Sequence, residues 1–199
     1  MSGAEVKPGT VSADYPITMA PITHAEDANR TDRDLRPDAA EAERLTRELG
    51  PRTCGIWQTM LGLTLELCAD PIPPATPETP QWSGYIALSG DWQGTIAVSC
   101  LEPAARQFAG AMFAMAADET SDAEIQDALG ELANLVGGQT KQLLGDRPVI
   151  GLPVVIKGDF KAVVPHSHKM ATLRFRTDGH GLEVAVVGAD ADGGRSAQC

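Results

Sequence analysis

The sequence predicts an α+β fold, in which an antiparallel sheet of about five to six strands is covered on one face by long helices. Two β-rich segments, residues 85–89 and 95–99, are joined by a short glycine-containing loop, which is typical of a β-hairpin. Two helical segments follow at residues 104–115 and 121–144, and alternating strands return near the C-terminus. Strands joined by hairpins pair antiparallel, and helices that are collected together cover one face of the sheet.

The segment before the hairpin predicts two short helices. Residues 38–49 have a weak helical pattern, which Gly50-Pro51 is expected to end because proline cannot continue a helix. Residues 52–61 form the second helical segment, with Gly62 as its C-cap. The remaining strand-like segments are residues 64–68, 149–156, 171–176 and 182–186.

Composition limits the classes of function. A net charge of −11 argues against nucleic-acid binding, because phosphate contacts need a basic surface. The sequence has no run approaching the ~18 apolar residues of a membrane helix, so we expect no membrane partner. It also lacks a basic start followed by an apolar core, so no secretory signal is expected and a cytoplasmic location is the default.

The polar, proline-containing start of the chain predicts a disordered tail over residues 1–37. The folded domain is expected at residues 38–188, followed by a flexible C-terminal tail at residues 189–199.

The cysteines and histidines give no metal or redox motif. No two cysteines are close enough in sequence for a C-x-x-C pattern, so all four are expected to be plain thiols in a reducing compartment. His166 and His168 have no cysteine or acidic residue nearby, which favours a surface loop over a metal site. We therefore expect no cofactor or metal that belongs to this chain.

Residues 121–144 predict the longest helix, and its two faces differ in chemistry. Ser121 and Glu124 form a capping-box pattern at its start. At about 100° per residue, one side collects the apolar residues Ile125, Leu129, Leu132, Val136 and Leu143. The opposite side collects Asp127, Glu131, Asn134 and Gly138, with Lys141 beside them. This polar stripe is expected to point directly away from the core, and it is either a solvated face or a binding face.

Three glycines in the interior of this helix favour a binding face. Gly130, Gly137 and Gly138 each cost up to ~1 kcal/mol relative to alanine, and they cluster on or near the polar side. A solvated face gains nothing from them, whereas a face that another backbone approaches closely does. Tight packing on a neighbouring helix is the alternative explanation.

The pattern Asp127-x-x-x-Glu131-x-x-Asn134, within DALGELANLVGG, resembles the signature of the CheC/CheX phosphatases, a family that also includes FliY. WQTMLGLTLEL resembles the first helix and strand of that family, SGYIALSGDWQGTIAVS its hairpin, and GLPVVIKG the strand after the signature helix. The resemblance covers about residues 52–188. It implies the CheC-like fold.

The resemblance also implies an activity, which is hydrolysis of the aspartyl phosphate on the receiver domain of a response regulator. Glu131 is then expected to pair with a basic group of the receiver, and Asn134 to hold the attacking water. Asp127 either orients the partner of Glu131 or only solvates the face. The phosphorylated receiver is expected to supply the Mg²⁺. The residues expected to contact the receiver itself are Gly130, Gly137, Gly138 and Lys141.

The sequence departs from the family in two respects. The first helix lacks a second E-x-x-N signature, so the chain resembles the single-site CheX type, which implies a homodimer. Pro153 lies a few residues earlier than the downstream proline of the family signature. Two other classes of function stay open, namely a non-catalytic module that binds or sequesters a receiver, and a structural subunit like those of the flagellar switch.

Overall fold

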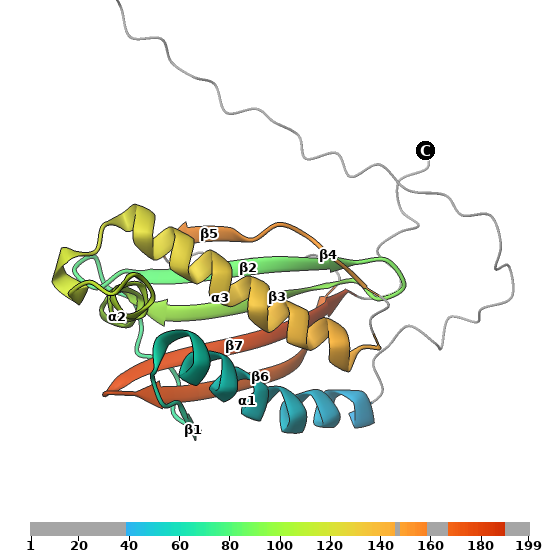
Figure 1. Cartoon of the computed structure of the whole chain (residues 1–199). Coiled ribbons are helices and arrows are strands. Elements are labelled where there is room, and N and C mark those ends of the chain that lie inside the picture. The colour runs from blue at the N-terminus through green and yellow to red at the C-terminus, as the bar shows by residue number, and fades with distance from the viewer. Residues whose placement is uncertain (1–38, 146–147, 159–166, 190–199) are drawn as a thin grey trace, which may run out of the picture. The chain divides into compact units, whose positions relative to one another are not determined.

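The computed structural model describes residues 39–145, 148–158 and 167–189, and these residues form one antiparallel sheet of seven strands with α-helices on one face (Figure 1). In chain order the elements are α1 (Ala39–Leu61), β1 (Glu66–Cys68), β2 (Gln81–Ser89), β3 (Gly94–Leu101), α2 (Glu102–Phe113), the short 3₁₀ turn η1 (Ala117–Glu119), α3 (Asp122–Leu143), β4 (Val149–Ile150), β5 (Val154–Lys157), β6 (Ser167–Thr177) and β7 (His180–Ala189). The predicted α+β class is confirmed, with seven strands in place of the expected five to six. The tail predicted at residues 1–37 lies outside the described residues, as does the predicted tail at residues 189–199 except for Ala189, which is the last residue of β7.

The strand order across the sheet is β1-β6-β7-β3-β2-β4, and β5 also pairs with β2. The predicted hairpin is the pair β2 and β3, which are in register from Gln81 opposite Leu101 to Leu88 opposite Gly94. β4 and β5 both lie along the outer edge of β2, so they form one edge strand with a break in the middle. This interrupted edge forms one wall of a groove.

Helix α1 is continuous, and the prediction that Gly50-Pro51 ends a first helix is wrong. An interior proline costs about 3 kcal/mol, because it removes one backbone hydrogen bond and crowds the preceding turn. Fully buried side chains on both sides of the proline, Leu49 and Trp57 among them, offset that cost, since each contributes about 1.5–3 kcal/mol when it is buried. The predicted C-cap is confirmed, because Gly62 has a φ of +68° and its N–H donates to the carbonyl of Gln58.

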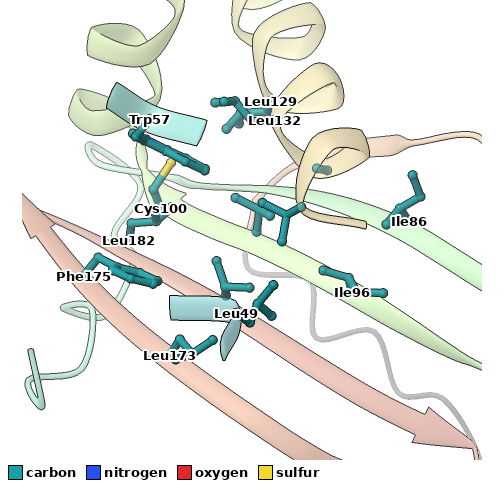
Figure 2. Close-up of a cluster of buried hydrophobic side chains, with 14 of the residues drawn as sticks. Leu49, Trp57, Ile86, Ile96, Cys100, Leu129, Leu132, Leu173, Phe175 and Leu182 are labelled. Atoms are coloured by element: carbon teal, nitrogen blue, oxygen red, sulfur yellow. The ribbon is translucent and has the colours of Figure 1, made fainter. Parts of the chain in front are cut away.

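The core lies between the helices and the sheet (Figure 2). The rings of Trp57 from α1 and Phe108 from α2 meet edge to face, with their centroids 5.6 Å apart. The predicted core stripe of α3 is confirmed, since all five of its apolar residues are buried: Ile125, Leu129, Leu132, Val136 and Leu143. None of the described helices combines the length and the apolar character needed to cross a membrane.

Gly84 of β2 allows α3 to lie directly on the sheet. A Cβ atom at this position would stand 2.8 Å from the carbonyl oxygen of Leu129 and 3.1 Å from the Cβ of Ala133. We expect Gly84→Ala to lower the free energy of unfolding by about 1–3 kcal/mol, because the helix must move away from the strand. Urea denaturation measures this. Gly181→Ala on β7 is the matched control, since its Cβ would meet only Ile72 at 3.6 Å, and an equal loss in that variant would contradict the explanation.

Lys157 of β5 connects the starts of α2 and α3. Its amino group lies 2.9 Å from a carboxylate oxygen of Asp122 and 3.3 Å from one of Glu102. Glu102 also accepts hydrogen bonds from Arg106, and the Lys157 ammonium stands 5.1 Å from the centroid of the Trp82 ring. The hydrogen bond to Asp122 is the largest of the effects that raise the pKa of Lys157. This ion-pair cluster fixes the beginning of α3 beside the edge strand.

The same cluster makes stability depend on pH. Burial raises the pKa of Glu102, but hydrogen bonds from Arg106 and Lys157 lower it by more, so its pKa in the folded chain lies below the ordinary value of 4.5. Such a carboxylate stabilises the fold above pH 4.5. This contribution is lost as the pH falls through the lower pKa that Glu102 has in the folded chain. We expect the free energy of unfolding to fall more steeply below pH 4.5 in the wild type than in Glu102→Gln, as measured by urea denaturation. Equal slopes would contradict this assignment.

Candidate active site

The signature helix α3 is fixed at both of its ends. The capping box predicted at its start is present: the Ser121 side chain accepts from the Glu124 N–H, and the Glu124 carboxylate accepts from the Ser121 N–H at 2.6 Å. The backbone hydrogen bond from Ser121 is the main cause that lowers the pKa of Glu124. Near the other end, Arg52 of α1 donates to Gln139 at 2.8 Å. Side chains on the exposed face of α3 therefore project from a helix that is held in place.

A groove of about 570 Å³ runs between α3 and the interrupted edge strand. Its helix wall consists of Gln126, Asp127, Gly130, Glu131 and Asn134. Its strand wall consists of Ile150, Gly151, Leu152, Pro153 and Val155. The Gly151 N–H still donates to the carbonyl of Ala87, and the strand is interrupted after it, at Leu152 and Pro153, before Val154 pairs with Tyr85. The structure therefore brings the predicted catalytic pair, Glu131 and Asn134, into one concave site with Pro153.

The surroundings of the polar stripe on α3 differ from those predicted from the sequence. It was expected to point directly away from the core, but it forms one wall of this groove. Asp127 and Glu131 are exposed, whereas Asn134 is half-buried deeper along the same face. The carboxylate of Glu131 is therefore open to a partner, and the carboxamide of Asn134 is partly shielded from bulk water.

The three interior glycines have different surroundings. Gly130 and Gly137 are both buried, but Gly130 lines the groove beside Glu131, so only Gly137 departs from the expectation that all three lie on or near the polar side. A Cβ at Gly137 would meet Ile86 at 2.7 Å and Ile150 at 3.2 Å, so close packing on the sheet explains this glycine. Only Gly138 opens onto free space, with no atom within 4 Å of a Cβ placed there. Lys141 follows it by three residues and is half-buried.

The groove offers the carboxylates of Asp127 and Glu131 for charge pairing, and the carboxamides of Gln126 and Asn134 as groups that can orient a water. Within the described part of the chain, no group of three or more His, Cys, Asp and Glu residues gathers in a metal-binding arrangement.

His168 lies in β6 and not in the predicted loop, and His166 falls outside the described residues. Among the described cysteines, Cys54, Cys68 and Cys100 are free thiols, and burial raises the pKa of Cys100 to about 12. Cys199 is not among the described residues.

Sequence reasoning missed the strand wall of the groove. Leu152 belongs to the predicted strand of residues 149–156, yet it is 88% exposed and lines the groove. The signal was the placement of Gly151 and Pro153 around a leucine, which is unfavourable for a continuous strand. The break at this point is what exposes Leu152.

The structure has the antiparallel sheet, the helices on one face and the Glu-x-x-Asn pair beside the sheet edge that the resemblance to the CheC/CheX phosphatases predicted. Residues 82–176 match the family model described as "Chemotaxis phosphatase CheX". The resemblance to CheX predicted from the sequence is therefore confirmed over these residues.

Solved structures agree with this assignment at the level of the fold. The chemotaxis protein CheX from Vibrio vulnificus matches with a TM-score of 0.59 and 20% identity, over 73% of this chain and 96% of that one. A putative chemotaxis protein from Desulfovibrio vulgaris Hildenborough matches with a TM-score of 0.58 and 21% identity, over 71% and 94%. The CheX-CheY-BeF₃-Mg²⁺ complex from Borrelia burgdorferi matches with a TM-score of 0.57 and 18% identity, over 77% and 99%. No curated protein matches the chain significantly.

Proposed function

We propose that the chain is a protein phosphatase that hydrolyses the aspartyl phosphate of a response regulator receiver domain. The observation that carries this proposal is the placement of Glu131 and Asn134 side by side in an open groove on a fixed helix. The CheX family match supports the class of reaction. The Borrelia burgdorferi structure, in which a CheX protein is in complex with CheY, BeF₃ and Mg²⁺, supports the class of partner.

In this mechanism Glu131 pairs with a basic group of the receiver and so sets the position of α3 over the phosphoryl group. Asn134 then places its carboxamide beside the phosphorus and orients a water for in-line attack. Phosphoryl transfer depends more on positioning and charge neutralisation than on covalent assistance, and an amide can orient water as glutamine does in GTPases. A half-buried side chain on a fixed helix has little freedom to lose when it takes up that position. Asp127 completes the acidic character of the wall.

The receiver supplies both the Mg²⁺ and the acyl phosphate. The groove of this chain therefore has only to bind a receiver that already carries its phosphoryl group and its metal ion. The Mg²⁺ neutralises phosphate oxygens, and Glu131 and Asn134 act from the open side. The homodimer implied by the single-site resemblance stays a prediction.

The experiment that tests the proposed function is the decay of a panel of phosphorylated CheY-type receivers with and without the chain. We expect at least one receiver to lose its phosphate faster when the chain is added. If every receiver decays at its intrinsic rate, the proposal is wrong.

A further inference from the structure

The edge strand beside the groove carries several exposed apolar side chains. The described residues include six large hydrophobic side chains that are exposed, and three of them, Val149, Leu152 and Val154, lie within six consecutive residues of the edge strand. Single exposed hydrophobic residues are ordinary on protein surfaces. Of these three, Leu152 lines the groove itself, and together with the half-buried Ile150 and Val155 it makes the strand wall apolar, which indicates a contact surface.

Leu152 is the most exposed of the three, at 88%, and its backbone is held on both sides. Before it, the Gly151 N–H donates to the carbonyl of Ala87 at 2.8 Å. After it, Pro153 restricts the backbone of Leu152 to extended conformations, and Val154 pairs with Tyr85 at the start of β5. A side chain presented from a fixed backbone loses little entropy on binding, which favours a role as an anchor.

The two walls of the groove differ in chemistry, and this difference defines the partner. The helix wall carries the exposed carboxylates of Asp127 and Glu131, neither of which forms an ion pair with another described residue. The strand wall is apolar, with Leu152 at its rim. A complementary surface carries a basic group and, across the width of the groove, an apolar side chain.

A second copy of this chain fits the groove less well than a receiver does. In a symmetric dimer formed through this face, the same patch lies opposite itself. The acidic helix walls of the two copies would then share one interface, and like charges brought together there oppose association. The partner that fits is one with a basic group beside its reactive centre.

We propose that Leu152 is the apolar anchor that selects the receiver, by packing against a hydrophobic side chain next to the phosphorylation site of the receiver. This inference rests on the proposed function, since it takes the receiver as the occupant of the groove. Glu131 and Asn134 act on features that receivers share, whereas Leu152 contacts a position that can differ between them. Discrimination among receivers therefore depends on the strand wall.

The test measures binding of CheY-type receivers held in their BeF₃·Mg²⁺ form to the wild type, Leu152→Asp, Leu67→Asp and Asn134→Ala. Leu67 is the matched control, because it is a leucine 63% exposed on β1 at the opposite edge of the sheet. We expect Leu152→Asp to weaken binding of the preferred receiver at least about tenfold, because an apolar contact is replaced by a charge. Leu67→Asp is expected to bind like the wild type, and thermal unfolding checks that both variants are folded.

The outcomes separate this inference from the proposed function. At saturating receiver, kcat of Leu152→Asp is expected to equal that of the wild type while KM rises. Wild-type affinity in Leu152→Asp, or an equal loss in Leu67→Asp, would overturn the anchor even if Asn134→Ala is inactive. Weak binding by Leu152→Asp together with full activity in Asn134→Ala would support the anchor and overturn the catalytic proposal. A change of oligomeric mass in Leu152→Asp, measured by light scattering, would assign the surface to a second copy and overturn the anchor.

Discussion

Asn134→Ala is expected to lower the rate of receiver dephosphorylation at least about 100-fold, because the attacking water loses the group that positions it. Receiver affinity is expected to change by less than about threefold, since a residue that acts mainly in the transition state contributes little to ground-state binding. Asn134 is half-buried on the helix wall, so its removal leaves the exposed Glu131 carboxylate in place. Phosphate release from a phosphorylated receiver measures the rate, and titration with the BeF₃·Mg²⁺ form measures the affinity.

The matched control for this prediction is Gln126→Ala. Gln126 carries the same carboxamide group and lines the same groove, but it lies two turns earlier on α3. Full activity in Gln126→Ala together with a large loss in Asn134→Ala would assign the effect to the position of the amide. If Asn134→Ala keeps more than about a tenth of the activity, transition-state positioning by this side chain is excluded.

Gly138→Leu is expected to stabilise the protein and at the same time weaken receiver docking at least about tenfold. An interior glycine costs the helix up to ~1 kcal/mol relative to good helix formers, and the open space around Gly138 leaves room for a side chain in the free protein. The same side chain would stand between α3 and a receiver that approaches the helix beyond Asn134. Opposite changes in stability and affinity are difficult to explain by partial unfolding.

Gly55→Leu provides the control for Gly138→Leu. Gly55 is also in a helix interior, on α1, and a Cβ there likewise meets nothing within 4 Å. Both variants are expected to gain stability in urea denaturation, but only Gly138→Leu is expected to lose affinity. Unchanged affinity in Gly138→Leu would show that the receiver does not approach this part of α3.

Local patterns predicted the signature helix well, because the relevant interactions are close in sequence. The capping box of Ser121 and Glu124 lies within one turn, and the apolar stripe of α3 repeats at the helical period, so neither needs knowledge of the remaining chain. The turn between β6 and β7 also depends on neighbouring residues alone, since the adjacent Asp178 and Gly179 both adopt the positive φ that such a turn requires.

Features that depend on distant residues could not be predicted in the same way. Pro51 is tolerated inside α1 because burial of Leu49 and Trp57 against other elements outweighs a local penalty. Gly137 is required by Ile86 of β2, a contact between residues far apart in sequence. The groove itself exists only because the edge strand breaks after Gly151, next to a helix that begins about thirty residues earlier.

The central claim is tested most directly by phosphate release when the phosphorylated receiver is in large excess over the chain. A phosphatase is expected to release many phosphates per chain, at a rate proportional to chain concentration and absent in Asn134→Ala. A binding module instead protects or sequesters one receiver per site and leaves the excess receiver to decay at its intrinsic rate. Stoichiometric binding without turnover would contradict the account.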